Sequence, residues 1–340
     1  MGQKIKDKVV VITGASSGIG RATALALADK GAIVVGAARR EEPLESLVEQ
    51  CRQRGGKALA VETDVTDFEA VQRLADQTVE QFGRLDVWFN NAGVSLFGRI
   101  EEVPLEVYRK VVETNFFGYV HGARAALPYF REQGGGMLIN NGSMLSKGGA
   151  PYLSAYAASK FAVYGMAESL RQELLDTDIE VCTLMPASID TPIFQNAANY
   201  TGRAVKPMDP VYPVEKVSNA VIKLMAKPEK EVYVGHSGRM LGAMHKVSPS
   251  LYTRFNARQV DKDHFQERPA PPSKGSVMEP RPQWTTATGG WRNGGLMDKK
   301  AVRALAFAGV ALTIPVVVGM LRDNGGQGES GLLSTLIPGL

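Results

Sequence analysis

Three residues carry side chains that together can move a proton: Ser143, Tyr156 and Lys160. Tyr156 and Lys160 stand four positions apart in the run YAASK, so a helix places them one turn apart on one face. A free tyrosine has a pKa of about 10 and is a slow base at neutral pH. A neighbouring ammonium group stabilises the phenolate and should lower that pKa. The pattern predicts a phenol that acts as general acid or base on a substrate oxygen, with Ser143 hydrogen-bonded to the same oxygen.

A glycine-rich turn supplies a second motif. Residues 13–20 read TGASSGIG, and Gly14, Gly18 and Gly20 stand between the strand-like run VVVIT and a helix-like stretch. Glycines at such a turn let the backbone and the helix N-terminus approach a pyrophosphate, whose charge the helix dipole favours. Turn glycines without a ligand are the alternative, although a chance cluster has no reason to lie at the first strand-to-helix turn. The motif predicts a dinucleotide site.

The end of the second strand-like run, AIVVGAARR, indicates which dinucleotide binds. Dinucleotide-binding folds often place an acidic residue here to hydrogen-bond the adenosine ribose. This run has none: Ala38 takes the acid's position and Arg39 follows it. A guanidinium group can bind a 2′-phosphate through two hydrogen bonds, so NADP(H) is preferred over NAD(H). The alternative is that Arg39 and Arg40 face solvent at a helix start.

Strand-like and helix-like runs alternate up to residue 235. This alternation predicts parallel strands with helical crossovers, and hence an α/β doubly wound parallel sheet (Rossmann fold) in a single catalytic domain with a C-terminal extension. The expected strands are VVVITG, IVVGAAR, ALAVETDV, LDVWFNNAG, GMLINNGS, IEVCTLMP and VYVG, and one long helical stretch is expected around residues 107–130.

Together these motifs resemble the short-chain dehydrogenase/reductase family, over roughly residues 7–235. The resemblance implies that Ser143, Tyr156 and Lys160 are catalytic, that Lys160 also binds the nicotinamide ribose, and that Asn115 positions a water that passes protons to solvent. One departure is Pro186-Ala187, where the family usually has Pro-Gly. The cofactor-binding residues expected from the motifs and the resemblance are Gly14, Ser16, Ser17, Gly18, Ile19, Gly20, Arg39, Asp64, Val65, Asn91, Ala92, Gly93, Tyr156, Lys160, Pro186 and Thr191.

The substrate pocket is expected between Ser143 and Tyr156 and after Thr191. These stretches offer an apolar set, which favours a hydrophobic alcohol or ketone; a small polar ketone or sugar is the alternative. Leu145, Tyr152 and Phe194 are the candidate substrate contacts, and the wider set adds Met144, Pro151, Leu153, Ile193 and Tyr200. A different class of function is a catalytically silent NADP(H)-binding regulatory or scaffold protein, since a fold alone does not imply turnover.

Composition excludes several other classes. With 39 basic and 35 acidic residues among 340, the net charge is only +4, so nucleic acid is a poor candidate partner. Two cysteines, Cys51 and Cys182, make no disulfide framework. The four histidines lack metal-like spacing, so no metal site is expected. Family resemblance implies a homo-oligomer.

The C-terminal third divides into four segments: an amphipathic cover (residues 236–265), a Pro/Gly-rich linker (266–298), a candidate transmembrane or membrane-anchoring helix (299–322) and a flexible tail (323–340). Residues 304–321 carry no charge and have basic flanks, which meets the usual length of a membrane span. A helix packed on the domain or in a dimer interface is the alternative. The basic flank before this segment predicts a cytoplasmic catalytic domain.

Overall fold

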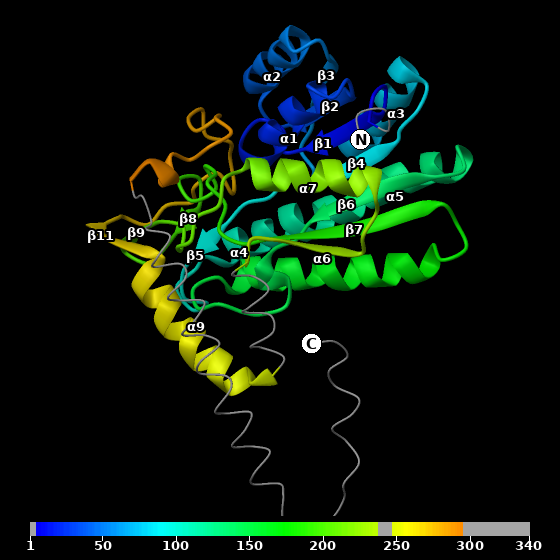
Figure 1. Ribbon diagram of the computed structural model, residues 1–340. Coiled ribbons are helices and arrows are strands. Elements are labelled where there is room, and N and C mark those ends of the chain that lie inside the picture. Colours follow the sequence, from blue (N-terminus) through cyan, green and yellow to red (C-terminus); the bar gives the residue numbers. More distant parts are fainter. Residues whose placement is uncertain (1–4, 237–246, 295–340) are drawn as a thin grey trace, which may run out of the picture. The chain divides into compact units, whose positions relative to one another are not determined.

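The computed structural model describes residues 5–236 and 247–294, with side chains up to Arg292. Within them, seven parallel strands form one sheet in the order β10-β7-β6-β4-β1-β2-β3 (Figure 1). They are β1 (Val9–Thr13), β2 (Ile33–Ala38), β3 (Lys57–Glu62), β4 (Val87–Asn90), β6 (Gly136–Asn141), β7 (Ile179–Pro186) and β10 (Glu231–Val234). All seven expected strands are present, and the predicted fold class is confirmed.

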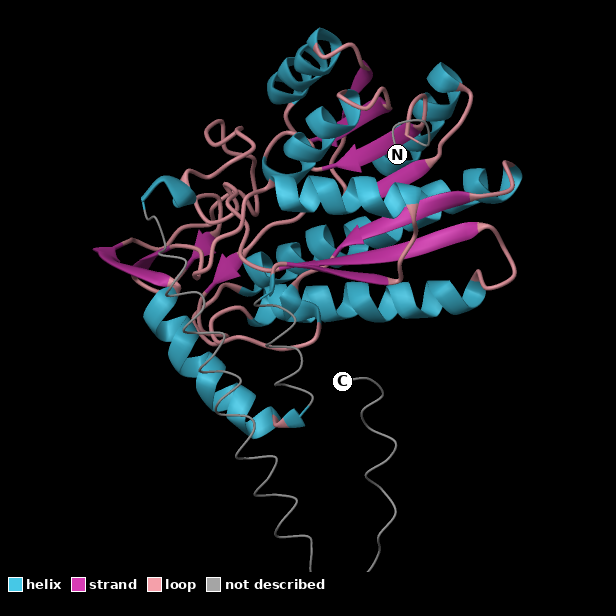
Figure 2. Cartoon of the chain, viewed as in Figure 1, coloured by secondary structure: helices cyan, strands magenta, loops and turns pink. Residues whose placement is uncertain are grey.

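Helices cover both faces of this sheet (Figure 2). Val10 and Ile12 face one layer of helices, whereas Val9 and Val11 face the other, because side chains alternate along a strand. The first layer holds α1 (Gly18–Ala28), α2 (Glu41–Gln53) and α7 (Glu215–Ala226), and the second holds α3 (Phe68–Phe82), α5 (Gly118–Glu132) and α6 (Ser154–Glu173). The central strands β1 and β2 are mostly apolar because both of their faces are buried.

The strand order reverses between β1 and β4. β1 leads to β2 on one side, whereas β4 lies on its other side, so the loops after these two strands diverge. In open α/β sheets such a reversal leaves a crevice at the carboxyl ends of the strands. The glycine-rich turn after β1 and the NNAG run after β4 both lie at this edge.

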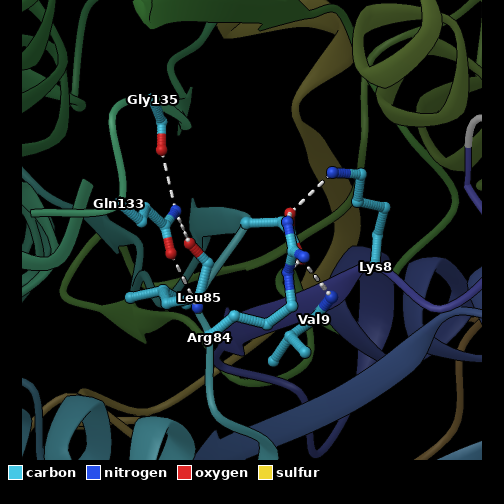
Figure 3. Close-up of polar contacts among 7 residues, drawn as sticks. Lys8, Val9, Arg84, Leu85, Gln133 and Gly135 are labelled. Carbon is cyan, nitrogen blue, oxygen red and sulfur yellow. Dashed lines mark hydrogen bonds and ion pairs between the residues drawn. The ribbon is translucent and has the colours of Figure 1, made fainter. Parts of the chain in front are cut away.

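At the opposite edge, a buried carboxylate joins the amino ends of β1 and β4 (Figure 3). Asp86 accepts hydrogen bonds from Lys8 Nζ at 2.7 Å, from Arg84 Nε at 2.8 Å and from the Val9 amide at 2.9 Å. Burial raises the pKa of Asp86, but the hydrogen bonds from Arg84, Lys8 and Val9 outweigh it, so the net shift of the pKa is downward.

The long helical stretch expected around residues 107–130 is divided. α4 (Leu105–Val112) passes through a π-helical turn, Glu113–Phe117, into α5. Asn115 lies within this turn and is fully buried. Single π-helical turns are rare and recur at functional sites.

Two short sheets stand apart from the main one. β5 (Leu96–Phe97) pairs with β8 (Ala198–Asn199), and β9 (Arg203–Val205) pairs with β11 (Phe265–Pro269). α9 (Pro249–Asp263) packs on the domain through Tyr252, Asn256 and Val260.

Within residues 266–292, predicted as part of a linker, several residues hydrogen-bond to the domain. After β11, we call residues 273–291 the C-terminal strap (orange in Figure 1). Val277 in the strap is fully buried in a cluster that includes Val94 and Val111. Hydrophobic periodicity does not predict this packing, because an irregular segment rich in proline and glycine has no repeating pattern even where one of its side chains is buried in a core.

No helix within residues 5–236 and 247–294 is long and apolar enough to cross a membrane. The predicted membrane segment, residues 299–322, lies outside the described residues.

Candidate active site

The three predicted catalytic residues meet at the carboxyl edge of the sheet. Ser143 lies just after β6, where it caps the 3-10 turn Met144–Ser146 and accepts a hydrogen bond from the Leu145 amide at 3.1 Å. Tyr156 and Lys160 lie on the first turns of α6. Lys160 Nζ is 5.7 Å from the centroid of the Tyr156 ring, as expected for residues one turn apart.

Burial sets the protonation of this group. It raises the pKa of Tyr156, and a hydrogen bond with Ser143 offsets only part of that rise. Burial lowers the pKa of Lys160 to about 7. The expectation that Lys160 lowers the pKa of Tyr156 is therefore not met, because desolvation disfavours both the phenolate and the ammonium. Near neutral pH, Tyr156 carries its proton and Lys160 titrates.

A chain of hydrogen bonds connects Lys160 to three strands. Its ammonium donates to the Asn141 carbonyl at 2.7 Å, at the end of β6. Asn141 Nδ2 donates to Asn91 Oδ1 at 3.0 Å, and Asn91 Nδ2 donates to the Thr13 carbonyl at 2.9 Å. Lys160 also donates to the Tyr119 hydroxyl at 3.3 Å. The sequence analysis did not single out Asn141 or Tyr119, whose contacts with Lys160 depend on the fold.

Asn115 holds two segments together. Its amide accepts from the Val94 N–H at 2.8 Å and donates to the Val94 carbonyl at 2.9 Å and to Ser159 Oγ at 3.2 Å. Ser159 is the residue before Lys160, so Asn115 fixes the start of α6 against the strand-to-helix loop after β4. The Asn115 side chain does not line the cavity described next.

A cavity of about 320 Å³ runs along this edge. It is lined by all the predicted site residues except Asn115, Gly20 and Tyr152. The lining residues among them are Gly14, Ser16, Ser17, Gly18, Ile19, Arg39, Asp64, Val65, Asn91, Ala92, Gly93, Ser143, Leu145, Tyr156, Lys160, Pro186, Thr191 and Phe194. The structure therefore brings together residues separated by up to 180 positions in the chain.

The glycines of the first turn have different tasks. A Cβ on Gly20 would lie 2.4 Å from the Gly14 carbonyl oxygen, so Gly20 is required by packing inside the turn. Gly18 has a φ of +56° and opens α1. A Cβ there would meet Thr191 at 3.5 Å, across the cavity. Gly18 therefore begins α1 at the cavity wall, in a backbone conformation that favours glycine.

At one end of the cavity, two guanidinium groups contact the C-terminal strap. Arg39 donates to the carbonyls of Ser276 at 2.8 Å and Met278 at 3.4 Å. Arg40 donates to the Arg281 carbonyl at 2.6 Å and to Ser16 Oγ at 3.1 Å. Burial lowers the pKa of both guanidinium groups. In the described part of the chain, neither forms an ion pair with a carboxylate.

Two buried amide oxygens on the wall, Asn141 Oδ1 and Asn196 Oδ1, have no hydrogen-bond partner among the described residues. Buried acceptors are normally paired, so these two suit a ligand with several hydroxyl groups, such as a dinucleotide with two riboses. Cationic groups at one end and a helix N-terminus in the middle match the phosphates. The residues present therefore fit a nicotinamide dinucleotide.

The other end of the cavity is largely apolar. Of the predicted apolar set, Met144, Leu145, Leu153, Ile193 and Phe194 line it, whereas Pro151, Tyr152 and Tyr200 do not. Tyr152 has a φ of +66° and donates instead to Asp261 Oδ1 at 3.0 Å, with its ring against Phe265. Residues that the sequence analysis missed complete this end: Phe97, Met208, Val260 and His264.

His264 is a polar group on the cavity wall, packed against Phe97 and Phe194. Its Nδ1 lies 2.8 Å from the Lys206 carbonyl, which only accepts, so Nδ1 carries the proton. Burial lowers the pKa of His264 to about 4, so the ring is neutral at physiological pH and Nε2 is an acceptor. No group of three or more metal-ligating side chains occurs within the described segments.

Comparison with known proteins agrees with this geometry. The family model described as short chain dehydrogenase matches residues 8–201. A Bacillus subtilis protein, the uncharacterized oxidoreductase YxnA, is 38% identical over 280 residues, or 81% of this chain and 79% of its own. The 11-beta-hydroxysteroid dehydrogenase A of Sesamum indicum is 35% identical over 68% of this chain and 69% of its own.

Two solved structures are similar as well. An alcohol dehydrogenase from Thermococcus sibiricus complexed with 5-hydroxy-NADP has a TM-score of 0.60 at 28% identity, covering 67% of this chain and 96% of that one. A short chain dehydrogenase/reductase from Burkholderia phymatum in complex with NAD has a TM-score of 0.65 at 27% identity, covering 72% and 96%.

Proposed function

This chain belongs to the short-chain dehydrogenase/reductase family and is an oxidoreductase acting on CH–OH groups with a nicotinamide cofactor, and we propose that it interconverts a hydrophobic secondary alcohol and its ketone, or an aldehyde, with NADP(H). The observation that carries this proposal is the set Ser143, Tyr156 and Lys160 on the wall of one cavity that extends from Arg39 to Phe194.

Tyr156 is the general acid of the reduction. Its raised pKa keeps the phenol protonated at neutral pH, so it can donate its proton to a carbonyl oxygen. Ser143 hydrogen-bonds and positions that oxygen. A bound NADPH supplies the hydride that the carbonyl carbon accepts. The phenolate left on Tyr156 lies beside Lys160, whose ammonium form stabilises it. In the oxidation, Tyr156 takes the alcohol proton.

The preference for NADP(H) is supported by Arg39 and Arg40. Both are partly desolvated cations at the end of the cavity, without a carboxylate partner in the described residues. An unpaired, buried charge is costly, and a phosphate dianion offsets that cost through charge-assisted hydrogen bonds. NADH lacks this phosphate.

The hydrophobic substrate is supported by the apolar end of the cavity. Phe97, Leu145, Leu153, Phe194 and Val260 surround the region beyond Tyr156. A small polar ketone or sugar would leave these side chains against water or against polar groups without partners. A steroid-like, retinoid-like or acyl ketone buries them.

A silent NADP(H)-binding scaffold is the competing function. Such a protein needs the glycine turn and Arg39 but has no use for Ser143 and Tyr156 set against an apolar pocket. Screening a library of ketones and aldehydes for NADPH consumption separates the two functions. Cofactor binding without turnover of any member would favour the scaffold.

The Tyr156→Phe variant tests the mechanism. We expect turnover to fall by about 10²–10⁴-fold, the usual contribution of general acid catalysis. Fluorescence titration should show that NADPH still binds, more tightly than NADH. Tyr164→Phe is the matched control, since Tyr164 is on the same helix but outside the cavity lining. Wild-type turnover in Tyr156→Phe would refute the mechanism, and equal or tighter NADH binding would refute the cofactor preference.

A further inference from the structure

The C-terminal strap, residues 273–291, contributes residues to the cavity lining and is held at both of its ends by residues 190–199. At its first end, Ser273 exchanges backbone hydrogen bonds with Asn199 at 2.8 and 2.9 Å, and the Ser276 amide donates to the Asn196 carbonyl at 2.8 Å. At its last end, Asp190 Oδ1 accepts from the amides of Gly289 at 3.0 Å and Trp291 at 2.9 Å. The strap therefore has a defined position at the cavity wall.

The middle of the strap touches the glycine turn itself. The Thr286 carbonyl accepts a hydrogen bond from the Gly18 amide at 2.9 Å. Since Gly18 is the first residue of α1, this contact lies at the helix N-terminus that favours a pyrophosphate. The match to the family model ends at residue 201, so the strap is an addition to the matched domain.

The strap also carries a third guanidinium group to the end of the cavity where Arg39 and Arg40 lie. Arg281 lines the cavity, and its Nη2 donates to Ser273 Oγ at 2.6 Å. Arg39 donates to Ser276, three residues further along the same turn of the strap. Arg40 donates to the backbone carbonyl of Arg281. All three arginines thus line the cavity and hydrogen-bond to residues 273–281 of the strap.

Among the described residues, none of these three groups forms an ion pair with a carboxylate. Asp64 is near enough to act on the charge of Arg39, but its ion pair, at 3.9 Å, is with Lys110. Like charges repel, so guanidinium groups that line one cavity favour an anion bound between them. A phosphate monoester, with close to two negative charges and three acceptor oxygens, has the required chemistry.

We propose that the strap is part of the cofactor site and that Arg281 binds the 2′-phosphate of NADP(H) together with Arg39 and Arg40. This inference rests on the proposed NADP(H) preference and extends it to a segment outside the matched domain. The strap carbonyls orient Arg39 and Arg40 through two hydrogen bonds each. Each guanidinium has five N–H donors, so enough remain for the phosphate.

Binding of nucleotide fragments tests this role without requiring a substrate. The ligands are 2′,5′-ADP and 5′-AMP, which differ by the 2′-phosphate, followed by NADPH and NADH. Hydrogen bonds to charged groups are worth about 1.5–3 kcal/mol, so Arg281→Gln should weaken 2′,5′-ADP and NADPH by about 10- to 100-fold. Affinity for 5′-AMP and NADH should change less than about twofold.

Two further variants sharpen the experiment. Arg281→Lys keeps the charge and should recover part of the lost affinity. Lys274→Gln removes one positive charge from the same strap at an exposed site that pairs with Glu106 at 3.8 Å and does not line the cavity. It should leave the preference for 2′,5′-ADP unchanged, which excludes a general effect of net charge.

The outcomes separate the inference from the proposed function. If wild-type protein prefers 2′,5′-ADP and NADPH but Arg281→Gln keeps that preference, Arg281 is not a phosphate ligand while the NADP(H) preference stands. If Arg281→Gln weakens all four ligands equally, the strap acts only on the shape of the cavity and the inference fails. Equal wild-type affinity for NADPH and NADH overturns both.

Discussion

Lys160 is a buried cation whose neighbours are neutral. It is 3% exposed and contacts the Asn141 carbonyl and the Tyr119 hydroxyl, with the Tyr156 ring beside it. Burial raises the pKa of both tyrosines and lowers that of Lys160 to about 7. A lysine that titrates near neutral pH can hold or release a proton next to the phenol, so the site's electrostatics are set by desolvation of all three groups.

This depressed pKa predicts how stability depends on pH. An unfolded lysine has a pKa of about 10.4, so between pH 7 and 10 the unfolded chain binds a proton that the folded chain does not. Stability therefore rises with pH through this window, by at most about 1.4 kcal/mol per pH unit from this group. Below pH 7 Lys160 is protonated in both the folded and the unfolded chain, and burial of its charge then destabilises the fold to the full extent.

Lys160→Met should remove this dependence. Urea unfolding without cofactor, from pH 6 to 9, should show wild-type stability rising relative to the variant. The variant should have its largest advantage at pH 6. Parallel pH dependences for the two proteins would contradict the depressed pKa. Tyr119 and Tyr156 are present in both proteins, so their titration cancels in the difference.

At the scale of elements, β1 and β4 are joined at both ends by polar groups. Asn91 binds the Thr13 carbonyl at the carboxyl end, and Asp86 binds Lys8, Val9 and Arg84 at the amino end (Figure 3). These contacts hold the two strands whose diverging loops form the crevice. The amino-end cluster lies far along the strands from Tyr156, so its loss should affect stability rather than chemistry.

Asp86→Asn tests this separation. At pH 7 the free energy of unfolding should fall by about 1–3 kcal/mol, because buried donors lose a charged acceptor. The folded pKa of Asp86 is lowered, so its contribution is present above the unfolded pKa of about 3.9 and is lost as the pH falls through the folded value.

The stability difference should therefore shrink in acid, while turnover per folded molecule stays near wild type. Asp29→Asn is the matched control: Asp29 pairs with Arg54 at 2.8 Å with both side chains exposed, and its loss should cost less than about 1 kcal/mol. An equal decrease in the free energy of unfolding in the two variants would show that the Asp86 cluster stabilises the fold no more than an exposed ion pair does.

At the scale of the molecule, the strap ends close to the last residues that the structure describes. Its last residue, Trp291, donates from Nε1 to the Thr191 carbonyl at 3.2 Å, next to the expected nicotinamide site. The charged residues Lys299 and Lys300 and the uncharged run 304–321 follow in the sequence. Those residues lie outside the described part, and their anchoring role stays a prediction from the sequence.

Carbonate extraction of membranes from expressing cells tests that prediction. The full-length chain should remain with the membranes after extraction, because an uncharged run of eighteen residues matches a membrane span. A chain ending at Arg292, where the packed unit ends, should be released. Release of the full-length chain, together with its solubility without detergent, would rule out an integral anchor.

The sequence by itself determined the seven strands, the glycine turn and the carboxyl edge at which the motif residues gather. Each depends on short-range rules: apolar runs alternate with helices, and motifs at the ends of parallel strands converge at one edge. For this reason Ser143, Tyr156, Lys160 and Arg39 line one cavity although the chain separates them widely.

Only the tertiary structure decided which residues complete the wall of the cavity. In the structure Tyr152 lies outside the cavity, whereas His264 and Val260 line it. Part of the predicted linker forms the strap, which contains Arg281. The structure also reversed the expected pKa shift of Tyr156. The physical reason is common to these cases. Burial and the packing of an irregular segment depend on which distant parts of the chain come into contact, and the local spacing of residues in the sequence does not predict those contacts.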